Sequence, residues 1–187
     1  RKEYRNDYYQ HADQVVALGN HPRTIDDVIV DCFQQVTHSL NQPAAARNFQ
    51  SVFWNIAYFD KPYFDGIFDN FVFPDGDLPQ WESVSWLQKR FMKWFNAERL
   101  RKPLTFPVET VSLLHDGSDF VDKEWADFTA EMWGEKHSFF LYISDSVDSL
   151  SSCCRLKNEI KENTFSFTLG AGGVSTGSKG VITINLN

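Results

Sequence analysis

Residues 144–187 read SDSVDSLSSCCRLKNEIKENTFSFTLGAGGVSTGSKGVITINLN, and this stretch is expected to organise the fold. A polar run leads through a glycine-rich turn into an alternating, strand-like segment at residues 181–186. Loops of this length inside compact domains are either functional or disordered. The adjacent pair Cys153 and Cys154, followed by Arg155, favours function, so the chemistry of the chain is predicted to lie here.

The residues around the cysteine pair leave several uses of sulfur open. Neighbouring cysteines can join only through a strained ring, which makes Cys153 and Cys154 a poor structural disulfide. No histidine stands near them in the sequence to act as a general base, so ordinary thiolate catalysis is not favoured. Arg155 could lower a thiol pKa, bind phosphate or pair with an acid. Buried, inert cysteines are the alternative.

Two sequence patterns resemble a known family. Cys-Cys-Arg-Leu at 153–156 is followed by Gly-Ser-x-Gly-Val-x-Thr-Ile-Asn-Leu at 177–186. Together they resemble the finger loop and following strand of the anaerobic (class III) ribonucleoside-triphosphate reductases, which are glycyl radical enzymes. Leu-Thr-Phe-Pro-Val at 104–108 is similar to the Phe-Thr-Phe-Pro strand before that loop. The chain departs from the family at Asn187, where proline is usual.

The resemblance implies a radical reaction. A thiyl radical, generated by a glycyl radical elsewhere, would remove hydrogen from the 3' carbon of a ribonucleotide so that the 2' hydroxyl can leave. Cys154, directly before Arg155, is the expected radical cysteine, and Cys153 is the second candidate. Asn185 matches the family's active-site asparagine, whose amide would hydrogen-bond the ribose hydroxyls. A satisfied polar residue on a strand is the alternative for Asn185.

Further substrate contacts are expected from Arg155 and from the glycine-rich run. Ser175, Thr176 or Ser178 could meet a phosphate, because amides in such a turn can hold an anion. The run fails the P-loop pattern, however, and plain turn flexibility is the alternative. Asn55 stands in an aromatic-rich region and could pair with a base or ribose, although such dense aromatics more often form core.

Composition limits the class of protein. A chain of 187 residues with 42% apolar and 16% aromatic residues can bury a core without spanning a membrane. A net charge of -7 argues against a nucleic-acid surface. Three cysteines without an apolar signal segment indicate a reducing, cytoplasmic setting. No metal-binding spacing of cysteine or histidine occurs.

The first clear helix is predicted from residue 25. Thr24 and Asp27 have the spacing of a capping box. Apolar residues then recur at helical spacing, and the predicted core face consists of Ile25, Val28, Ile29, Cys32, Val36 and Leu40. Cys32 is therefore expected to be buried.

Later elements indicate a parallel sheet. Trp81 to Trp94 repeat at helical spacing, and Pro103 ends that helix. Asp122 is the expected N-cap of a later helix, with Gly134 just past its end. A strand, this helix and a second strand are predicted at residues 104–113, 122–133 and 138–143. Such a unit places its strands parallel with a right-handed crossover.

The expected fold class is α/β, with two parts in one incomplete domain. Residues 1–102 form a mainly helical, aromatic-rich part, and residues 103–187 form a βαβ segment with the cysteine loop. The resemblance implies that this segment belongs to the α/β barrel of glycyl radical enzymes. Because the chain begins at Arg1 and stops within a predicted strand, it is expected to be a fragment, whether a split-gene product or an excerpt.

The resemblance also implies cofactors and partners outside this chain. The glycyl radical and a four-cysteine zinc site would lie in a missing C-terminal part, and none would be bound by these residues. The expected partners are a ribonucleoside triphosphate, allosteric nucleotide effectors, the missing part, a radical-SAM activating enzyme and a second copy in a homodimer. Two rivals remain: another glycyl radical enzyme, such as a formate-lyase-like acyltransferase, or a noncatalytic nucleotide-binding module.

Overall fold

A computed structural model of the chain describes residues 7–17, 21–45, 48–49, 51–68, 71–147, 149–152 and 156–159. In chain order, the elements in these ranges are η1 (Tyr8–His11), β1 (Val15–Ala17), β2 (Arg23–Thr24), α1 (Ile25–Asn41), β3 (Asn55–Phe59), α2 (Lys61–Phe68), α3 (Trp81–Arg101), β4 (Val108–Leu114), α4 (Lys123–Gly134), β5 (Phe140–Ser144), β6 (Ser149–Ser152) and β7 (Leu156–Glu159).

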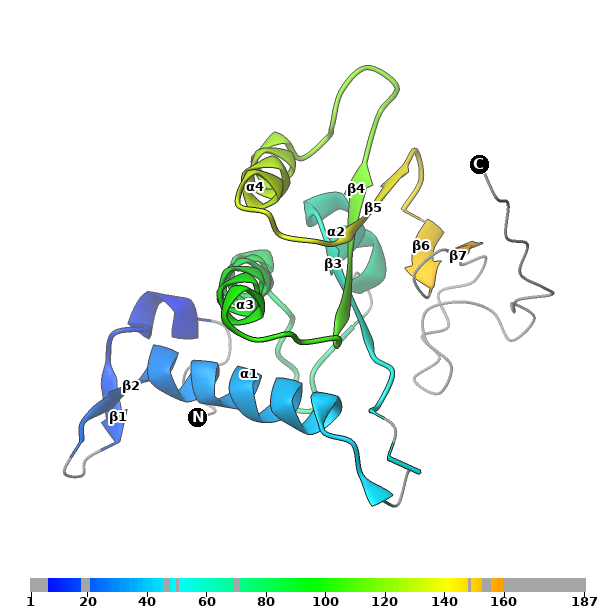
Figure 1. The fold of residues 1–187 in the computed structure, drawn as a ribbon. Coiled ribbons are helices and arrows are strands. Elements are labelled where there is room, and N and C mark those ends of the chain that lie inside the picture. The colour runs from blue at the N-terminus through cyan, green and yellow to red at the C-terminus, as the bar shows by residue number, and fades with distance from the viewer. Residues whose placement is uncertain are drawn as a thin grey trace, which may run out of the picture.

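A three-stranded parallel sheet in the order β3-β4-β5 lies at the centre of the chain (Figure 1). The strands β4 and β5 are joined through α4, and Thr110 pairs with Phe140 in a parallel register, which confirms the predicted βαβ unit with parallel strands. The part before residue 103 also supplies a strand, β3, where the sequence indicated only an aromatic-rich segment. The mixed α/β fold class is confirmed.

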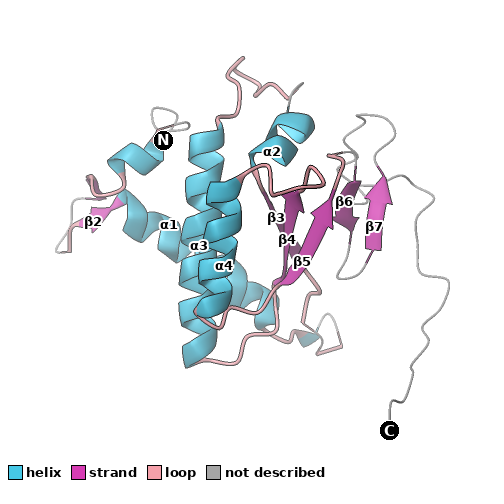
Figure 2. Cartoon of the chain, turned by 90° about the horizontal axis from the view of Figure 1, so that it is seen from above, coloured by secondary structure: helices cyan, strands magenta, loops and turns pink. Residues whose placement is uncertain are grey.

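The sheet has helices on one face and a hairpin on the other. Helices α3 and α4 cover the first face, and the β6–β7 hairpin lies on the opposite side (Figure 2). Strand β6 is in contact with β4, the central strand. The chain segment that leads into the cysteine pair therefore crosses the sheet face that the helices leave open.

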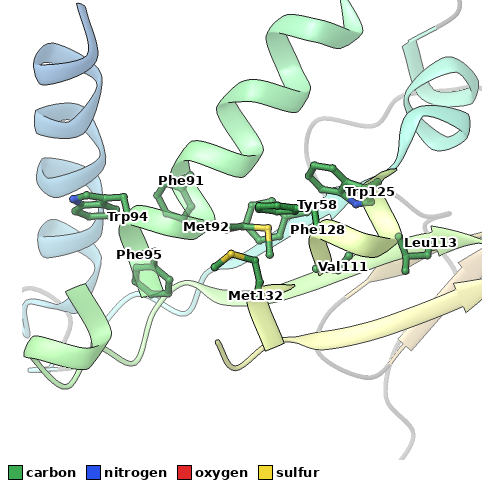
Figure 3. Close-up of a cluster of buried hydrophobic side chains, with 10 residues drawn as sticks. All are labelled: Tyr58, Phe91, Met92, Trp94, Phe95, Val111, Leu113, Trp125, Phe128 and Met132. Atoms are coloured by element: carbon green, nitrogen blue, oxygen red, sulfur yellow. The ribbon is translucent and has the colours of Figure 1, made fainter. Parts of the chain in front are cut away.

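The main core lies between the sheet and α3 and α4 (Figure 3). Aromatic and sulfur-containing side chains fill it, and its buried members are Tyr58, Phe91, Met92, Trp94, Phe95, Val111, Leu113, Trp125, Phe128 and Met132. Because aromatic side chains each bury a large apolar area, this cluster accounts for much of the stabilisation of the layer. The predicted α3 is confirmed, and it ends at Arg101, just before Pro103.

Helix α1 begins as predicted but presents a different face to the core. The Thr24 side chain accepts from the Asp27 backbone N–H, and the Asp27 carboxylate accepts from the Thr24 N–H, which confirms the capping box. Val30 and Phe33 pack against the core, however, and Cys32 is exposed. The prediction that Cys32 is buried is wrong, because the aromatic ring of Phe33 packs against Phe91 and Trp94 of α3 and fixes the helix rotation.

Replacing Thr24 by alanine is expected to weaken the first turn of α1 by about 1 kcal/mol, because an alanine cap leaves the Asp27 N–H without its acceptor. Hydrogen exchange of peptides that span residues 24–30 should show faster opening. Exchange in α4, whose cap is Asp122, serves as the internal reference and should not change. Unchanged exchange at residues 24–30 would contradict a stabilising role for the cap.

Helix α4 ends differently from the prediction. Asp122 is its N-cap and accepts from the Trp125 N–H, as expected. Gly134, however, is the last residue of the helix, and the left-handed residue beyond it is Lys136 with a φ of 65°. The backbone N–H of His137 then donates to Met132 O at 3.0 Å, so backbone hydrogen bonds around Lys136 close the helix without glycine.

The segment before β4 is held by a side chain of α1. The sequence indicated a strand from residue 104, but the strand begins at Val108. The Asn41 side chain accepts from the backbone N–H of Thr105 at 2.9 Å and of Phe106 at 3.0 Å, and it donates to Phe106 O at 2.5 Å. These backbone groups are thus bound by Asn41 instead of a neighbouring strand.

Candidate functional site

Most of the predicted site residues lie outside the described part of the chain. These are Cys153, Cys154, Arg155, Ser175, Thr176, Ser178 and Asn185, together with the strand predicted at residues 181–186. Asn55 is described, and the strands that flank the cysteine pair are described as well. The environment of the site is therefore built from the sheet and from these strands.

The cysteine pair connects the two strands of a hairpin. Strands β6 and β7 are antiparallel, with Ser149 opposite Glu159 and Ser152 opposite Leu156. Residues 153–155 are then the connection between them. The expectation of one long loop from residue 144 to the strand predicted at residues 181–186 is wrong for residues 149–152 and 156–159, because these residues form paired strands.

The sheet face beneath this hairpin carries small polar side chains. Val111 and Leu113 belong to the core on the helix side, and side chains alternate along a strand. Thr110 and Ser112 therefore lie on the opposite face, the same side as Asn55, which alternates with the core-packed Ile56. We call Asn55, Thr110 and Ser112 the polar wall.

Two atoms of the polar wall are buried without a hydrogen-bond partner among the described residues. They are the Asn55 Oδ1 and the Ser112 hydroxyl oxygen. A buried polar atom that lacks a partner costs about 1–3 kcal/mol, so such atoms usually have a functional or solvent partner. The polar wall thus offers hydrogen-bonding capacity on the side where the hairpin lies. Sequence reasoning selected Asn55 and missed Thr110 and Ser112, although their alternation with Val111 and Leu113 is a usable signal.

A second polar cluster lies on the helix side of the sheet. Glu109 is buried, and its carboxylate accepts from the Tyr58 hydroxyl at 2.7 Å. His137 Nε2 lies 2.6 Å from the same carboxylate, and Arg99 Nη1 lies 3.5 Å from it. Burial, followed by the nearby Glu109 charge, raises the pKa of Tyr58 well above its usual value. We call these four residues the Glu109 cluster, and alternation places it on the face opposite the polar wall.

Asp60 ties the carboxyl ends of the strands together. Its Oδ2 accepts from the backbone N–H of Leu114 at 2.7 Å, and its Oδ1 accepts from that of Tyr63 at 3.2 Å. The side chain thereby joins the end of β3 to β4 and to the first turn of α2. Burial raises the pKa of Asp60 above its usual value of 3.8, against the lowering effect of these two hydrogen bonds.

Replacing Asp60 by asparagine is expected to loosen this junction by about 1–3 kcal/mol, because the amide NH2 would face one of the two backbone N–H donors, whereas even a protonated carboxyl has an oxygen at both positions. The folded-state pKa lies above the unfolded value, so the folded state binds the proton more tightly. The advantage of aspartate over asparagine should accordingly shrink as the pH rises from 3.8 through the folded-state pKa. Hydrogen exchange at Tyr63 and Leu114, measured at several pH values, tests both statements. A difference that grows with pH would contradict them.

The described residues contain no group of three or more histidine, cysteine, aspartate or glutamate side chains that could hold a metal ion. Among the helices that the structure describes, none has the length and apolar character needed to cross a membrane.

Comparison with a family model gives a match over nearly the whole chain. The model is described as anaerobic ribonucleoside-triphosphate reductase, and it matches residues 4–187. This range includes all the predicted site residues, those outside the described part among them. No curated protein sequence matches the chain.

Solved structures of a Thermotoga maritima protein are similar to this chain. The anaerobic ribonucleotide reductase with citrate in the active site is 38% identical, with a TM-score of 0.61, over 66% of this chain and 22% of that one. The same reductase in complex with dATP and CTP is 39% identical, with a TM-score of 0.63, over 72% of this chain and 22% of that one. The match thus spans about a fifth of the length of these structures.

Proposed function

The chain belongs to the anaerobic ribonucleoside-triphosphate reductase family, and from this premise we propose that it supplies the radical-cysteine segment of an enzyme that reduces ribonucleotides to deoxyribonucleotides. The observation that carries the proposal is the family match over residues 4–187, which includes the cysteine pair and Asn185. The pairing of β6 with β7, the strands on either side of the cysteine pair in the sequence, and the contact of β6 with β4 support it.

The proposed reaction begins with hydrogen transfer to sulfur. A glycyl radical in another part of the enzyme would supply the unpaired electron when that part is present. The Cys154 sulfur, with Cys153 as the second candidate, takes a hydrogen atom from the ribose 3' carbon, so that an S–H bond forms and a C–H bond breaks. The 2' hydroxyl then leaves as water after it takes up a proton. A two-electron reductant reduces the sugar, and the sulfur returns its hydrogen atom to the 3' carbon, which restores the C–H bond.

The remaining site residues bind and orient the substrate in this proposal. The Asn185 amide hydrogen-bonds the ribose hydroxyls, and Arg155 pairs with a phosphate. Turn amides and hydroxyls at Ser175, Thr176 and Ser178 contribute further phosphate contacts. The buried Oδ1 of Asn55, which has no partner among the described residues, is suited to accept from a hydroxyl or amino group of the nucleotide.

The complete enzyme is proposed to need components beyond this chain. They are a C-terminal part with the glycyl radical and a zinc site, a radical-SAM activating enzyme and a second copy of the protein. Nucleoside triphosphates would act as substrate and as effectors, as the dATP and CTP bound to the Thermotoga maritima reductase suggest. A cytoplasmic location fits oxygen-sensitive radical chemistry.

The test compares reaction classes with the complete protein, activated without oxygen. Deoxynucleotide formation from CTP, followed by chromatography, is the expected result. Acetyl-CoA formation from pyruvate and CoA, without any deoxynucleotide, would instead assign the protein to the acyltransferase branch of glycyl radical enzymes. Nucleotide binding without either product would instead assign the protein as a noncatalytic nucleotide-binding module.

A further inference from the structure

Helix α2 contacts both β4 and the turn at residues 145–147, which leads from β5 into the cysteine hairpin. The Tyr63 hydroxyl, fully buried, donates to the backbone oxygen of Ser146 at 3.4 Å. The Ser144 hydroxyl donates to the same oxygen at 3.1 Å and accepts from the Ser146 N–H at 3.3 Å. The polar groups of this turn are therefore bound both from the helix and from the end of β5.

Gly66 brings the backbone of α2 against the same turn. A Cβ atom added at Gly66 would lie 3.0 Å from Cγ2 and 3.2 Å from Cβ of Val147. Either distance is shorter than ordinary van der Waals contact, so an added Cβ requires Val147 or the helix to move by a few tenths of an ångström. Alanine is a better helix former than glycine, so the helix itself gives no reason for a glycine at this position. The contact with Val147 gives one.

The other end of α2 is fixed to the scaffold. Asp60 binds the Tyr63 N–H and the Leu114 N–H, and the Lys61 N–H donates to the Asp122 carboxylate at 3.1 Å. The first turn of α2 is thus joined to β4 and to the cap of α4. Because α2 is fixed at this end, its contacts with Ser146 and Val147 fix the position of the turn relative to the sheet.

We propose that α2 is the positioning element of the cysteine hairpin, with Tyr63 and Gly66 as positioning residues. Val147 precedes the first residue of β6, Ser149, by two positions, and β6 leads directly to Cys153. The contact at Gly66 therefore sets where the hairpin begins above the polar wall, and so the distance between the sulfur and the sugar. This inference rests on the proposed function, because the distance matters only if the sulfur reacts.

The activity test uses the complete, activated reductase with Gly66→Ala and Gly66→Val. A displacement of about 1 Å can lower the rate of a positioned reaction about 10²-fold. We expect kcat to fall about tenfold with alanine and about 10²-fold with valine, while KM for the nucleotide and the glycyl radical signal in electron paramagnetic resonance stay at wild-type values. The matched control is Gly134→Ala at the end of α4, where an added Cβ meets nothing within 4 Å, and it should leave kcat unchanged.

Two further variants keep the proposal open to refutation if Gly66→Val fails to fold. Val147→Ala in the Gly66→Ala background removes the methyl groups that the new Cβ would meet, and it should restore most of kcat. Tyr63→Phe removes only the hydroxyl and should lower kcat without changing KM. Wild-type kcat in Gly66→Ala and Tyr63→Phe would overturn the proposal. A decrease in kcat that is proportional to a decrease in the glycyl radical signal would also overturn it, because the defect would then lie in activation.

A readout independent of turnover separates this proposal from the function on which it rests. The alkylation rates of Cys153 and Cys154 by iodoacetamide, followed by mass spectrometry, report the placement of the hairpin. The exposed Cys32 is the internal reference. We expect the alkylation rates of Cys153 and Cys154, each divided by that of Cys32, to change in Gly66→Ala and to stay constant in Gly134→Ala. An unchanged ratio in both would refute the positioning role, whereas a wild-type enzyme without deoxynucleotide product would refute the proposed function alone.

Discussion

Replacing Cys154 by alanine in the complete reductase is expected to lower kcat at least about 10³-fold, because the reaction then lacks the sulfur that takes the hydrogen atom. KM for the nucleotide should change little, since the sulfur contributes to the chemical step and not to ground-state binding. The measurement is anaerobic deoxynucleotide formation, with the glycyl radical signal recorded in each sample to show that activation succeeded.

The other two cysteines are the controls for this experiment. Cys32→Ala should keep wild-type turnover, because Cys32 is exposed on α1, away from the hairpin. Cys153→Ala should retain measurable turnover if Cys154 carries the radical. The reverse pattern would assign the radical to Cys153, and full activity in both hairpin variants would remove sulfur from the mechanism.

Replacing Glu109 by alanine is expected to destabilise the sheet and its helix layer by about 3–5 kcal/mol. The Glu109 carboxylate is the shared acceptor of the Glu109 cluster, and its removal leaves the Tyr58 hydroxyl and His137 unpaired in a buried site. The side chains of both Glu109 and His137 are 0% exposed, so bulk solvent does not reach the groups that lose their acceptor. Thermal unfolding, together with hydrogen exchange in β3 and β4, measures the loss.

The control is an exposed ion pair in the same layer. Glu124 accepts from Lys89 at 2.7 Å, but its side chain is 85% exposed. Glu124→Gln should change stability by no more than about 0.5 kcal/mol, because exposed ion pairs contribute little. Equal losses in the two variants would show that burial does not decide the strength of the Glu109 cluster.

Local signals predicted the parts of the fold that depend on near neighbours. The capping box at Thr24 and Asp27, the aromatic repeat of α3 and the Asp122 cap of α4 each involve residues a few positions apart. Strand β3 was not predicted, because residues 55–59 lack the alternation of apolar and polar side chains that marks a half-buried strand. Its pairing with β4 joins residues about fifty positions apart.

The candidate site divides in the same way. The motif at residues 153–156 and Asn185 could be identified because the family resemblance depends on sequence alone. The polar wall could not, because only the folded structure brings β6 into contact with β4, the strand that carries Thr110 and Ser112. The Glu109 cluster was missed for a similar reason, since Tyr58, Glu109 and His137 are far apart in the chain and meet only in the folded layer.

By itself, the sequence determined the family, the N-caps of α1 and α4 and the parallel strand–helix–strand unit, and it supplied the residues to which the proposed chemistry is assigned. These depend on residue identity and on spacings of a few positions along the chain. Only the tertiary structure decided which face of α1 is buried, which strands pair and how closely α2 approaches the turn before the cysteine hairpin. Those features depend on side-chain volume and hydrogen bonding between segments that come together only on folding, and the approach of Gly66 to Val147 is one of them.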